Sequence, residues 1–198
     1  MLYKVKITGL APIIHHSAAG LDPKLPANLE KAAIAKKRGA NRTASDDARL
    51  SELETFTSLW LNQEDKPEIP ASALRTVIES GVRRLRQGPL VRGGLMVLSC
   101  DEFEYDLERY GTTLEELQKT TQFAVPVVVQ RSRILRTRAK FELPWSATFT
   151  VEVYDDEVGK DQLERWLAIA GRSIGLGNWR PEKSGPYGRF ELTSITEA

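Results

Sequence analysis

The sequence predicts an α+β fold in which helices pack against an antiparallel sheet. Residues 2–8 alternate between apolar and polar side chains, which is the pattern of a half-buried strand. Residues 145–153 alternate even more regularly, and a helical pattern follows over about 161–172. Phe190 and Leu192 then mark a final strand. This order of elements is typical of an α+β protein, and the two ends of the chain resemble strand–helix–strand pieces of a ferredoxin-like fold.

A basic stretch follows the opening strand. Pro12 breaks the strand, and residues 17–44 combine small residues with many Lys and Arg. Residues 29–38 are expected to form a short helix within this stretch. Because the stretch is long for a plain loop, it is either functional or partly disordered.

Two further helices are predicted in the first half of the chain. One has Ser45 as its N-cap and runs to about Leu61, with Leu and aromatic residues recurring on one face. The other has Ser72 as its N-cap and is ended by Gly88.

The middle of the chain predicts strands, because its apolar period shifts toward two. Residues 95–98 form one candidate strand, and Phe103 and Tyr105 suggest its antiparallel partner. Thr113 and Glu116 have the spacing of a capping box, which predicts a short helix there.

The composition excludes several classes of protein. The chain has 198 residues, of which 41% are hydrophobic and 28% charged, so we expect one globular domain spanning 1–198. No apolar run is long enough to cross a membrane, and no secretory signal is visible, so we expect a cytoplasmic protein. Cys100 is the only cysteine, and only two histidines are present, so we expect no disulfide, no metal and no cofactor.

The net charge of +1 hides clusters of opposite sign. Positions 24–42 hold six cations and one acid, and positions 131–140 hold five cations and no acid. Positions 101–116 hold seven acids and one arginine. Such separation suits a protein that binds a polyanion on one side and its own copies on another, and the alternative is ordinary solvated surface.

The cations of 131–140 form a ladder along a predicted strand. Alternate side chains of a strand share a face, which places Arg136, Arg138 and Lys140 together and Arg131 with Arg133 on the opposite face. Their spacing of roughly 6–7 Å matches the phosphates of an extended single strand. Cations on an edge strand also serve to block aggregation, which is the alternative interpretation.

The glycine-rich segment 171–190 is the most distinctive motif in the chain. Its exposed backbone N–H groups, with Arg180, Lys183 and Arg189 beside them, suit phosphate groups. Trp179 and Tyr187 offer stacking surfaces for bases. The alternative is a tight connection between helix and strand, with the tryptophan filling the core.

Three segments together resemble the RAMP superfamily of CRISPR-associated proteins, whose domains have RNA-recognition-like ferredoxin folds. Residues 6–14 run from a strand into a proline turn, and 171–190 form the glycine-rich stretch before the last strand. Residues 69–75 are similar to the family's Ile-Pro-Gly-Ser-Ser-Leu-Lys/Arg helix start, with Ala71 in place of glycine. The ending also resembles uncharacterised phage and prophage proteins, and these resemblances imply a prokaryotic cell or a phage-infected host. Insertions are expected at about 17–66 and 99–123, which the resemblance does not cover.

Within that superfamily the chain is most similar to the backbone subunits that coat a guide RNA. The resemblance implies a non-enzymatic subunit that binds single-stranded RNA, or less readily DNA, and forms a filament of its own copies along that ligand, alone or with other effector subunits. It also implies that the helix start at Ser72 and Arg75 lies near the nucleic-acid backbone. The residues expected to contact nucleic acid are His15, His16, Lys36, Lys37, Arg38, Arg42, Ser72, Arg75, Arg131, Arg133, Arg136, Arg138, Lys140, Trp179, Arg180, Lys183, Tyr187 and Arg189.

Two other functions compete with this interpretation. Endoribonucleases of the same superfamily often use a histidine as general acid or base, so His15 or His16 suggests a metal-independent endoribonuclease. Some backbone subunits carry an aspartate that cleaves target RNA, and Asp22, Asp46 and Asp47 are the candidates here. The second competing function is that of a phage assembly protein, in which the basic segments contact the acidic segment 101–116 of a neighbouring copy.

Overall fold

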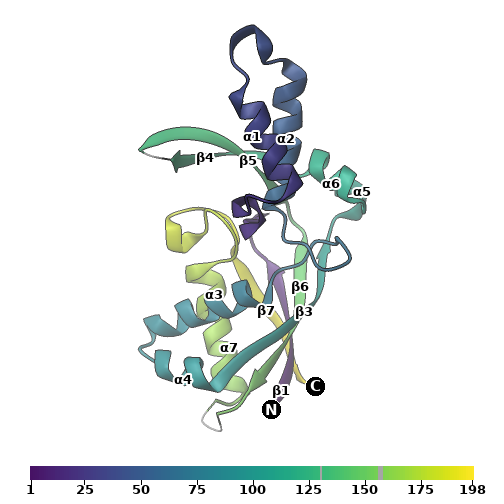
Figure 1. Ribbon diagram of the computed structural model, residues 1–198. Coiled ribbons are helices and arrows are strands. Elements are labelled where there is room, and N and C mark those ends of the chain that lie inside the picture. Colours follow the sequence, from purple (N-terminus) through teal and green to yellow (C-terminus); the bar gives the residue numbers. More distant parts are fainter. Residues whose placement is uncertain (130, 156–157) are drawn as a thin grey trace. The chain divides into compact units, whose positions relative to one another are not determined.

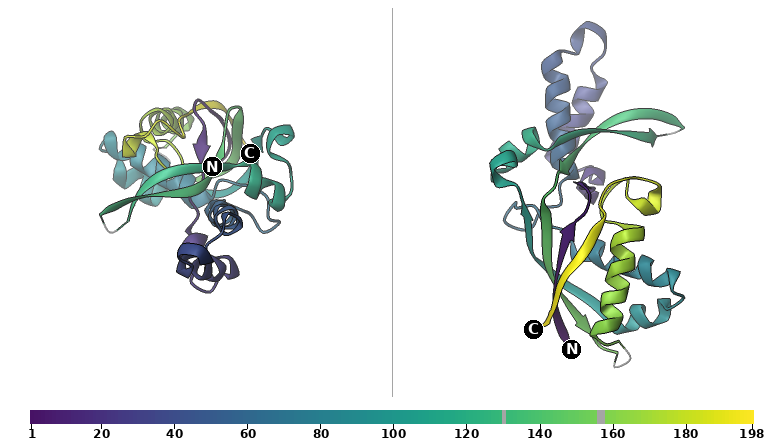
Figure 2. Two further views of the ribbon diagram at one scale, coloured as in Figure 1. Left: turned by 90° about the horizontal axis from the view of Figure 1, so that it is seen from above. Right: turned by 180° about the vertical axis from the view of Figure 1, so that it is seen from behind.

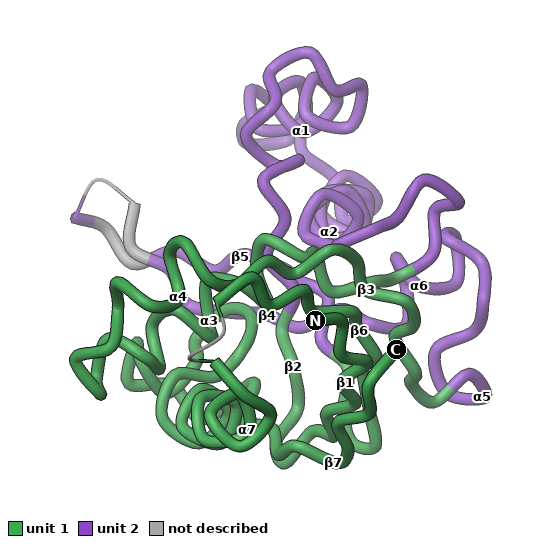
Figure 3. The backbone as a smooth tube through the Cα atoms, turned by 90° about the horizontal axis from the view of Figure 1, so that it is seen from below, with its two compact units in different colours: residues 1–14, 67–106, 141–198 green, residues 15–66, 107–140 purple. Residues whose placement is uncertain are grey.

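The chain forms two compact units (Figure 3). The computed structural model describes residues 1–129, 131–155 and 158–198, and at 128, 129, 132 and 133 it describes the backbone alone. Unit 1 comprises residues 1–14, 67–106 and 141–198, and unit 2 comprises residues 15–66 and 107–140. Among the described residues, no helix combines the length and the apolar character needed to cross a membrane.

Unit 1 has a four-stranded antiparallel sheet (Figure 1). Its strands, in the order in which they lie side by side, are β3 (Leu95–Tyr105), β6 (Trp145–Val153), β1 (Leu2–Gly9) and β7 (Phe190–Glu197). Helices α3 (Ala71–Arg84) and α7 (Lys160–Ile169) join them in the chain order β1–α3–β3–β6–α7–β7. This is the βαββαβ order of the ferredoxin-like fold, so the predicted α+β fold class is confirmed.

The core of unit 1 lies between the sheet and helices α3 and α7, which cover the same face of the sheet (Figure 2). The alternation of β1 buries Tyr3, Val5 and Ile7 on this face, as the sequence pattern predicts. Trp166 of α7 and Ile78 of α3 are fully buried on the facing side. Each such side chain stabilises the fold by about 1.5–3 kcal/mol through the area it removes from water.

The opposite face of the sheet is polar. Lys6 of β1 pairs with Glu104 of β3 at 2.7 Å, and Thr8 shares a hydrogen bond of 2.6 Å with Thr193 of β7. The ion pair reaches across β6, which lies between β1 and β3, and the hydroxyl pair joins the adjacent strands β1 and β7. This face is therefore held by ion pairs and hydroxyl groups.

Strand β3 corrects one expectation. Phe103 and Tyr105 do not form a separate partner strand, because β3 runs without a break from Leu95 to Tyr105 and pairs with β6 throughout. The register shifts between Val97 and Ser99, and again between Cys100 and Glu102. These two bulges change the spacing of the inward-facing residues, so the strand lacks the strict alternation by which a strand is recognised in a sequence.

Two helix starts also differ from their expected positions. The N-cap of α2 (Ala44–Ser58) is Thr43, not Ser45, because Asp46 completes a capping box with Thr43. The N-cap of α3 is Pro70, and Ser72 lies inside the first turn of that helix. The remaining short elements of unit 1 are β2 (Ile13–Ile14), α4 (Gly88–Gly94), a π-helical turn at Ala170–Ile174 and a 3-10 turn at Pro181–Lys183.

Unit 2 contains a helical hairpin and a β-hairpin. Helices α1 (Pro26–Lys36) and α2 pack around a small apolar core of Ala27, Ile34 and Leu53. Strands β4 (Gln122–Val129) and β5 (Ser132–Phe141) pair antiparallel, and the short helices α5 (Leu107–Tyr110) and α6 (Leu114–Thr120) precede them. Thr113 and Glu116 form the expected capping box at α6.

The two segments that the resemblance leaves uncovered can be assigned to the units, and their role as insertions stays a prediction. The whole of 17–66 belongs to unit 2. Residues 107–123 of the second predicted insertion also belong to it, whereas residues 99–106 form the end of β3 in unit 1.

Candidate nucleic-acid interface

Three cations of the predicted ladder lie on one face of β5. Arg136, Arg138 and Lys140 occupy alternate positions of this strand, so their side chains leave the same face. The ammonium group of Lys140 lies 3.9 Å from the centre of the Phe123 ring on β4, a cation–π contact. The hairpin therefore holds a row of cations in fixed register.

The other two ladder residues lie at the turn between β4 and β5. Arg131 is exposed there and has a left-handed backbone with φ of +68°. The side chain of Arg133 lies outside the described residues, so its role stays a prediction.

A cavity of about 480 Å³ lies within unit 2, lined by α1, α2 and β5. Its charged and hydroxyl-bearing lining includes Lys31, Glu54, Thr57, Arg136 and Arg138. The Lys31 ammonium donates a hydrogen bond of 2.8 Å to the Thr57 hydroxyl, which directs the lysine toward α2. His16, which is exposed, also contributes to the wall.

The cavity carries an excess of positive charge. Lys31, Arg136 and Arg138 bring three positive charges and Glu54 brings one negative charge, so with histidine counted as neutral the net charge is +2. Burial lowers the pKa of Lys31, and the nearby Arg136 and Arg138 lower it further against the opposing effect of Glu54. Burial also lowers the pKa of Arg138. Both cations are therefore partly stripped of water in a region of like charge.

Glu54 uses both of its carboxylate oxygens within unit 2. One oxygen accepts a hydrogen bond of 2.6 Å from Arg136, and the other accepts one of 2.7 Å from the backbone N–H of Thr137. Lys31 and Arg138 make no ion pair with any described residue. Glu54 thus neutralises Arg136 and leaves the other two cations without a carboxylate partner.

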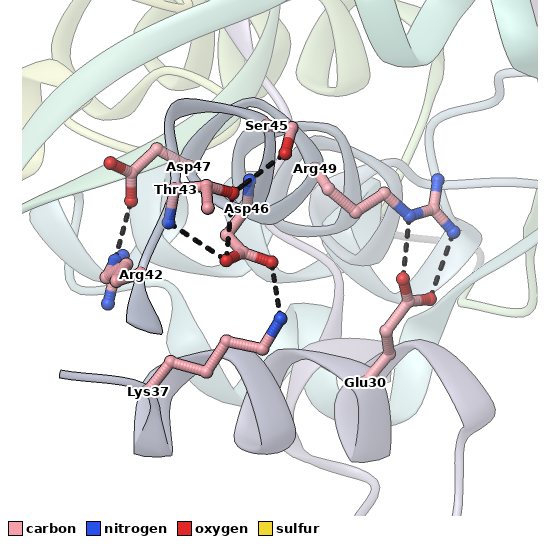
Figure 4. Close-up of polar contacts among 8 residues, drawn as sticks. All are labelled: Glu30, Lys37, Arg42, Thr43, Ser45, Asp46, Asp47 and Arg49. Atoms are coloured by element: carbon pink, nitrogen blue, oxygen red, sulfur yellow. Dashed lines mark hydrogen bonds and ion pairs between the residues drawn. The ribbon is translucent and has the colours of Figure 1, made fainter. Parts of the chain in front are cut away.

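The end of α1 and its connection to α2 carry a second cluster of cations, of which Figure 4 shows Lys37 and Arg42. The predicted contacts here are Lys36, Lys37, Arg38 and Arg42. Lys37 pairs with Asp46 at 2.7 Å, and Arg42 pairs with Asp47 at 2.7 Å. The other two cations are exposed and form no ion pair with a described residue. Half of this cluster is therefore neutralised by its own chain.

The candidate catalytic aspartates have structural partners. Hydrogen bonds from Lys37 and from the Thr43 backbone lower the pKa of Asp46 to about 2. Asp47 pairs with an arginine, and the Asp22 carboxylate accepts a hydrogen bond of 2.8 Å from the Lys24 backbone. No set of His, Cys, Asp and Glu side chains in the described ranges is arranged to hold a metal ion.

His15 corrects another expectation, because its side chain is fully buried. Its Nδ1 accepts a hydrogen bond of 3.2 Å from the Trp60 backbone, and its ring lies 4.7 Å from the Trp60 ring. Burial lowers the pKa of His15 to about 3, far below the neutral pH at which a general acid or base works best. The prediction that this side chain contacts nucleic acid is therefore wrong. His16 is exposed and lies beside the cavity.

In unit 1, the start of α3 offers a weaker site than the resemblance implies. Ser72 is exposed in the first turn. Arg75 is half-buried and donates hydrogen bonds to Glu79 at 2.9 Å and to the backbone carbonyl of Arg92 at 3.3 Å. Its guanidinium therefore already holds α3 to the segment that follows.

The glycine-rich loop uses its backbone groups internally. The N–H groups of Gly175, Leu176, Gly185 and Gly188 each donate to a carbonyl of unit 1. Gly188 has a φ of +71°, and a Cβ at this position would overlap the Leu176 carbonyl. These glycines permit a close-packed connection, so the backbone does not present the open phosphate-binding concavity that we expected.

The aromatic residues of the same loop are accessible. Trp179 is 36% exposed, and its ring lies 5.7 Å from the Tyr187 ring. Trp179 also has a φ of +50°, an uncommon conformation for a bulky residue. The tryptophan does not fill the core, which removes the alternative interpretation of this residue.

The cations of the loop are engaged with their own chain. Arg180 forms two hydrogen bonds with Glu182, at 2.6 and 3.1 Å. Arg189 donates to the backbone carbonyl of Arg172 at 3.3 Å, and Lys183 is exposed. Two of the three predicted cations thus stabilise the loop.

Sequence reasoning missed Lys31, Glu54 and Thr57 as members of a site. Glu54, Thr57 and Ser58 lie three and four positions apart on α2, so they form a polar stripe on one face of the helix. The Ser58 hydroxyl accepts a hydrogen bond of 2.8 Å from the Ala139 N–H of β5. This polar stripe, on a helix that also has an apolar face, was the feature of the sequence that could have indicated a site on α2.

The exposed face of the unit 1 sheet differs from the binding face of RNA-recognition motifs. Those motifs stack bases on aromatic residues of the sheet. In the two central strands β1 and β6, both described in full, the outward positions carry Leu2, Lys4, Lys6, Thr8, Ser146, Thr148, Thr150 and Glu152 instead. These two strands therefore lack the aromatic stacking surface of that mode.

Comparisons with known proteins give a likeness of fold. No protein-family model matches the sequence, and no curated protein does. Among solved structures, a chain of "Cryo-EM structure of the Type III-B Cmr-beta bound to cognate target RNA" is similar, with a TM-score of 0.50 and 13% sequence identity. The alignment covers 98% of this chain and 59% of that chain. The likeness is one of fold alone, and it agrees with the α+β fold class expected from the sequence.

Proposed function

We propose that this chain is a single-stranded RNA-binding subunit of a CRISPR-type effector complex, that it assembles with its own copies along the RNA, and that it has no catalytic activity. The observation that carries the proposal is the excess positive charge of the cavity and β5 in unit 2. Cations held in register bind a phosphate backbone through charge rather than base identity.

The likeness to a chain of an RNA-bound Type III-B complex supports this proposal. That complex contains target RNA, so a chain of this fold occurs within an RNA-bound assembly. The present chain spans only 59% of the length of that neighbour. Its assembly partners and its binding to a guide RNA are therefore proposed here.

The first experiment measures the binding of a labelled single-stranded RNA at several salt concentrations. The variant combines Arg136→Gln, Arg138→Gln and Lys140→Gln. We expect its affinity for every RNA sequence to fall alike, and the slope of log affinity against log salt to fall by about 0.7 for each lost phosphate contact.

A matched control removes three exposed lysines outside this surface, by Lys24→Gln, Lys66→Gln and Lys160→Gln. The control loses the same charge and should keep nearly the wild-type slope. Equal losses in both variants would mean that net charge, not the β5 surface, determines binding.

The same samples distinguish the competing functions. Intact RNA after long incubation supports a binding subunit, whereas cleavage that His16→Ala abolishes would establish an endoribonuclease. Sizing before and after nuclease treatment tests assembly, because a filament that needs RNA falls apart when the RNA is digested. Assembly that persists without nucleic acid would favour the phage assembly protein.

A further inference from the structure

The cavity of unit 2 has features that an open RNA-binding surface does not require. A phosphate backbone that passes over a surface is bound adequately by exposed cations. Here Lys31 and Arg138 instead line a cavity of about 480 Å³. The Nε atom of Arg138 is buried and makes no hydrogen bond to any described residue. A buried donor of a charged group is costly to leave without an acceptor.

The charge of the cavity specifies the ligand more closely. Glu54 is already bonded to Arg136 and to the Thr137 N–H, so two cations remain to be balanced. A phosphodiester brings one negative charge, whereas a phosphomonoester brings about −1.5 to −2 at neutral pH. A phosphomonoester therefore matches the cavity better than a link within a chain does.

The size and the remaining lining agree with a nucleotide. The volume lies within the roughly 300–1,000 Å³ typical of small-molecule sites. Leu21, Leu50 and Val127 add apolar surface to the wall, and such surface suits a sugar or a base.

We propose that the cavity bounded by Lys31, Thr57 and Arg138 binds the phosphomonoester of a nucleotide, in particular the terminal phosphate of an RNA strand. The Arg138 guanidinium on β5 donates to the phosphate oxygens, and Lys31 on α1 supplies the second positive charge. The strand-end assignment rests on the proposed function, whereas the phosphate site itself does not.

The decisive measurement is calorimetric binding of uridine 5′-monophosphate, uridine and the methyl ester of uridine 5′-monophosphate to the full chain. We expect the monophosphate to bind at least about ten-fold more tightly than uridine, because charged hydrogen bonds of this type are strong, and the ester to lie between them. Arg138→Gln and Lys31→Gln should each remove most of this difference.

Lys24→Gln is the matched control, because it removes an exposed lysine of the same unit that does not line the cavity. It should leave the preference for the monophosphate intact. Circular dichroism melts of all three variants verify folding, and Arg138→Lys, which keeps the charge but not the planar fork, should retain part of the preference.

The strand-end assignment is tested with RNA ten-mers that carry a 5′-phosphate, a 3′-phosphate or hydroxyl groups at both ends. One phosphorylated end should bind more tightly than the hydroxyl form, in the wild type but not in Arg138→Gln. If all three ten-mers bind alike and the monophosphate binds no better than uridine, the phosphate site is excluded even though RNA binds. If the monophosphate binds as expected but RNA does not, the cavity stands and the proposed function fails.

Discussion

The two units differ in how certain of their cations are bonded, although unit 2 also holds ion-paired cations such as Lys37 and Arg136. In unit 1, Arg75, Arg180 and Arg189 each bond to a carboxylate or a carbonyl of their own unit. In unit 2, Lys31 and Arg138 are partly buried and make no ion pair with a described residue. A folded chain pays a desolvation penalty for such cations, which an anionic ligand relieves. The difference teaches that the number of cations in a segment says less about binding than the bonds they already make.

The largest expected effect comes from removing the two cations of unit 2 that have no carboxylate partner, compared with removing two bonded cations of unit 1. The double variant Lys31→Gln with Arg138→Gln should lower RNA affinity about 10- to 100-fold, because it removes the two charges that lack a carboxylate partner. The double variant Arg180→Gln with Arg189→Gln should lower it less than about three-fold. Fluorescence anisotropy against a labelled RNA measures both, and an equal loss in the two variants would end the distinction between the units.

A smaller effect is expected at the loop of unit 1. Trp179→Ala should cost about 1–3 kcal/mol of RNA binding, because an accessible indole is a stacking surface. Stacking carries no charge, so the salt dependence should stay as in the wild type. Urea unfolding should show a loss well below the 3–5 kcal/mol typical of a buried tryptophan. A changed salt slope would mean that the loop contributes charge after all.

The smallest effect concerns the ion pairs at the α1–α2 connection. The pKa of Asp46 is lowered from 3.8 to about 2, so its contribution to stability is present above pH 3.8 and is lost as the pH falls toward 2. The variant Asp46→Asn should therefore unfold more readily than the wild type at pH 5, and the difference should vanish near pH 2. Thermal melts between these values measure it. A constant difference at all pH values would assign the effect to the helix cap alone.

The regular strands and the helices of unit 1 were predictable, because their core positions follow simple periods. The alternation of β1 and β6 appears directly in the burial of their side chains. Strand β3 was divided wrongly because two bulges place its inward residues at 95, 97, 100 and 103 rather than at every second position. A bulge depends on the partner strand, which the local pattern does not contain.

The candidate site was only partly predictable for a related reason. The ladder was visible, because charges at alternate positions of a strand share a face. The ion-pair partner of each charge was not visible, since Glu54 lies 82 positions from the Arg136 that it neutralises. His15 likewise looks identical in sequence to the exposed His16, and only the fold buries one beside Trp60.

The order of the segments along the chain has a consequence for synthesis on the ribosome. Unit 2 is complete once residue 140 has been made. At that point unit 1 has only β1, the two-residue β2, α3, α4 and β3, and strands β1 and β3 are not neighbours, because β6 lies between them in the finished sheet. At that stage β1 and β3 of unit 1 still lack the strand that pairs with both of them, whereas every residue of unit 2 is present. Exposed strand edges promote aggregation, and the edges that β1 and β3 present to β6 stay open until β6 has been made.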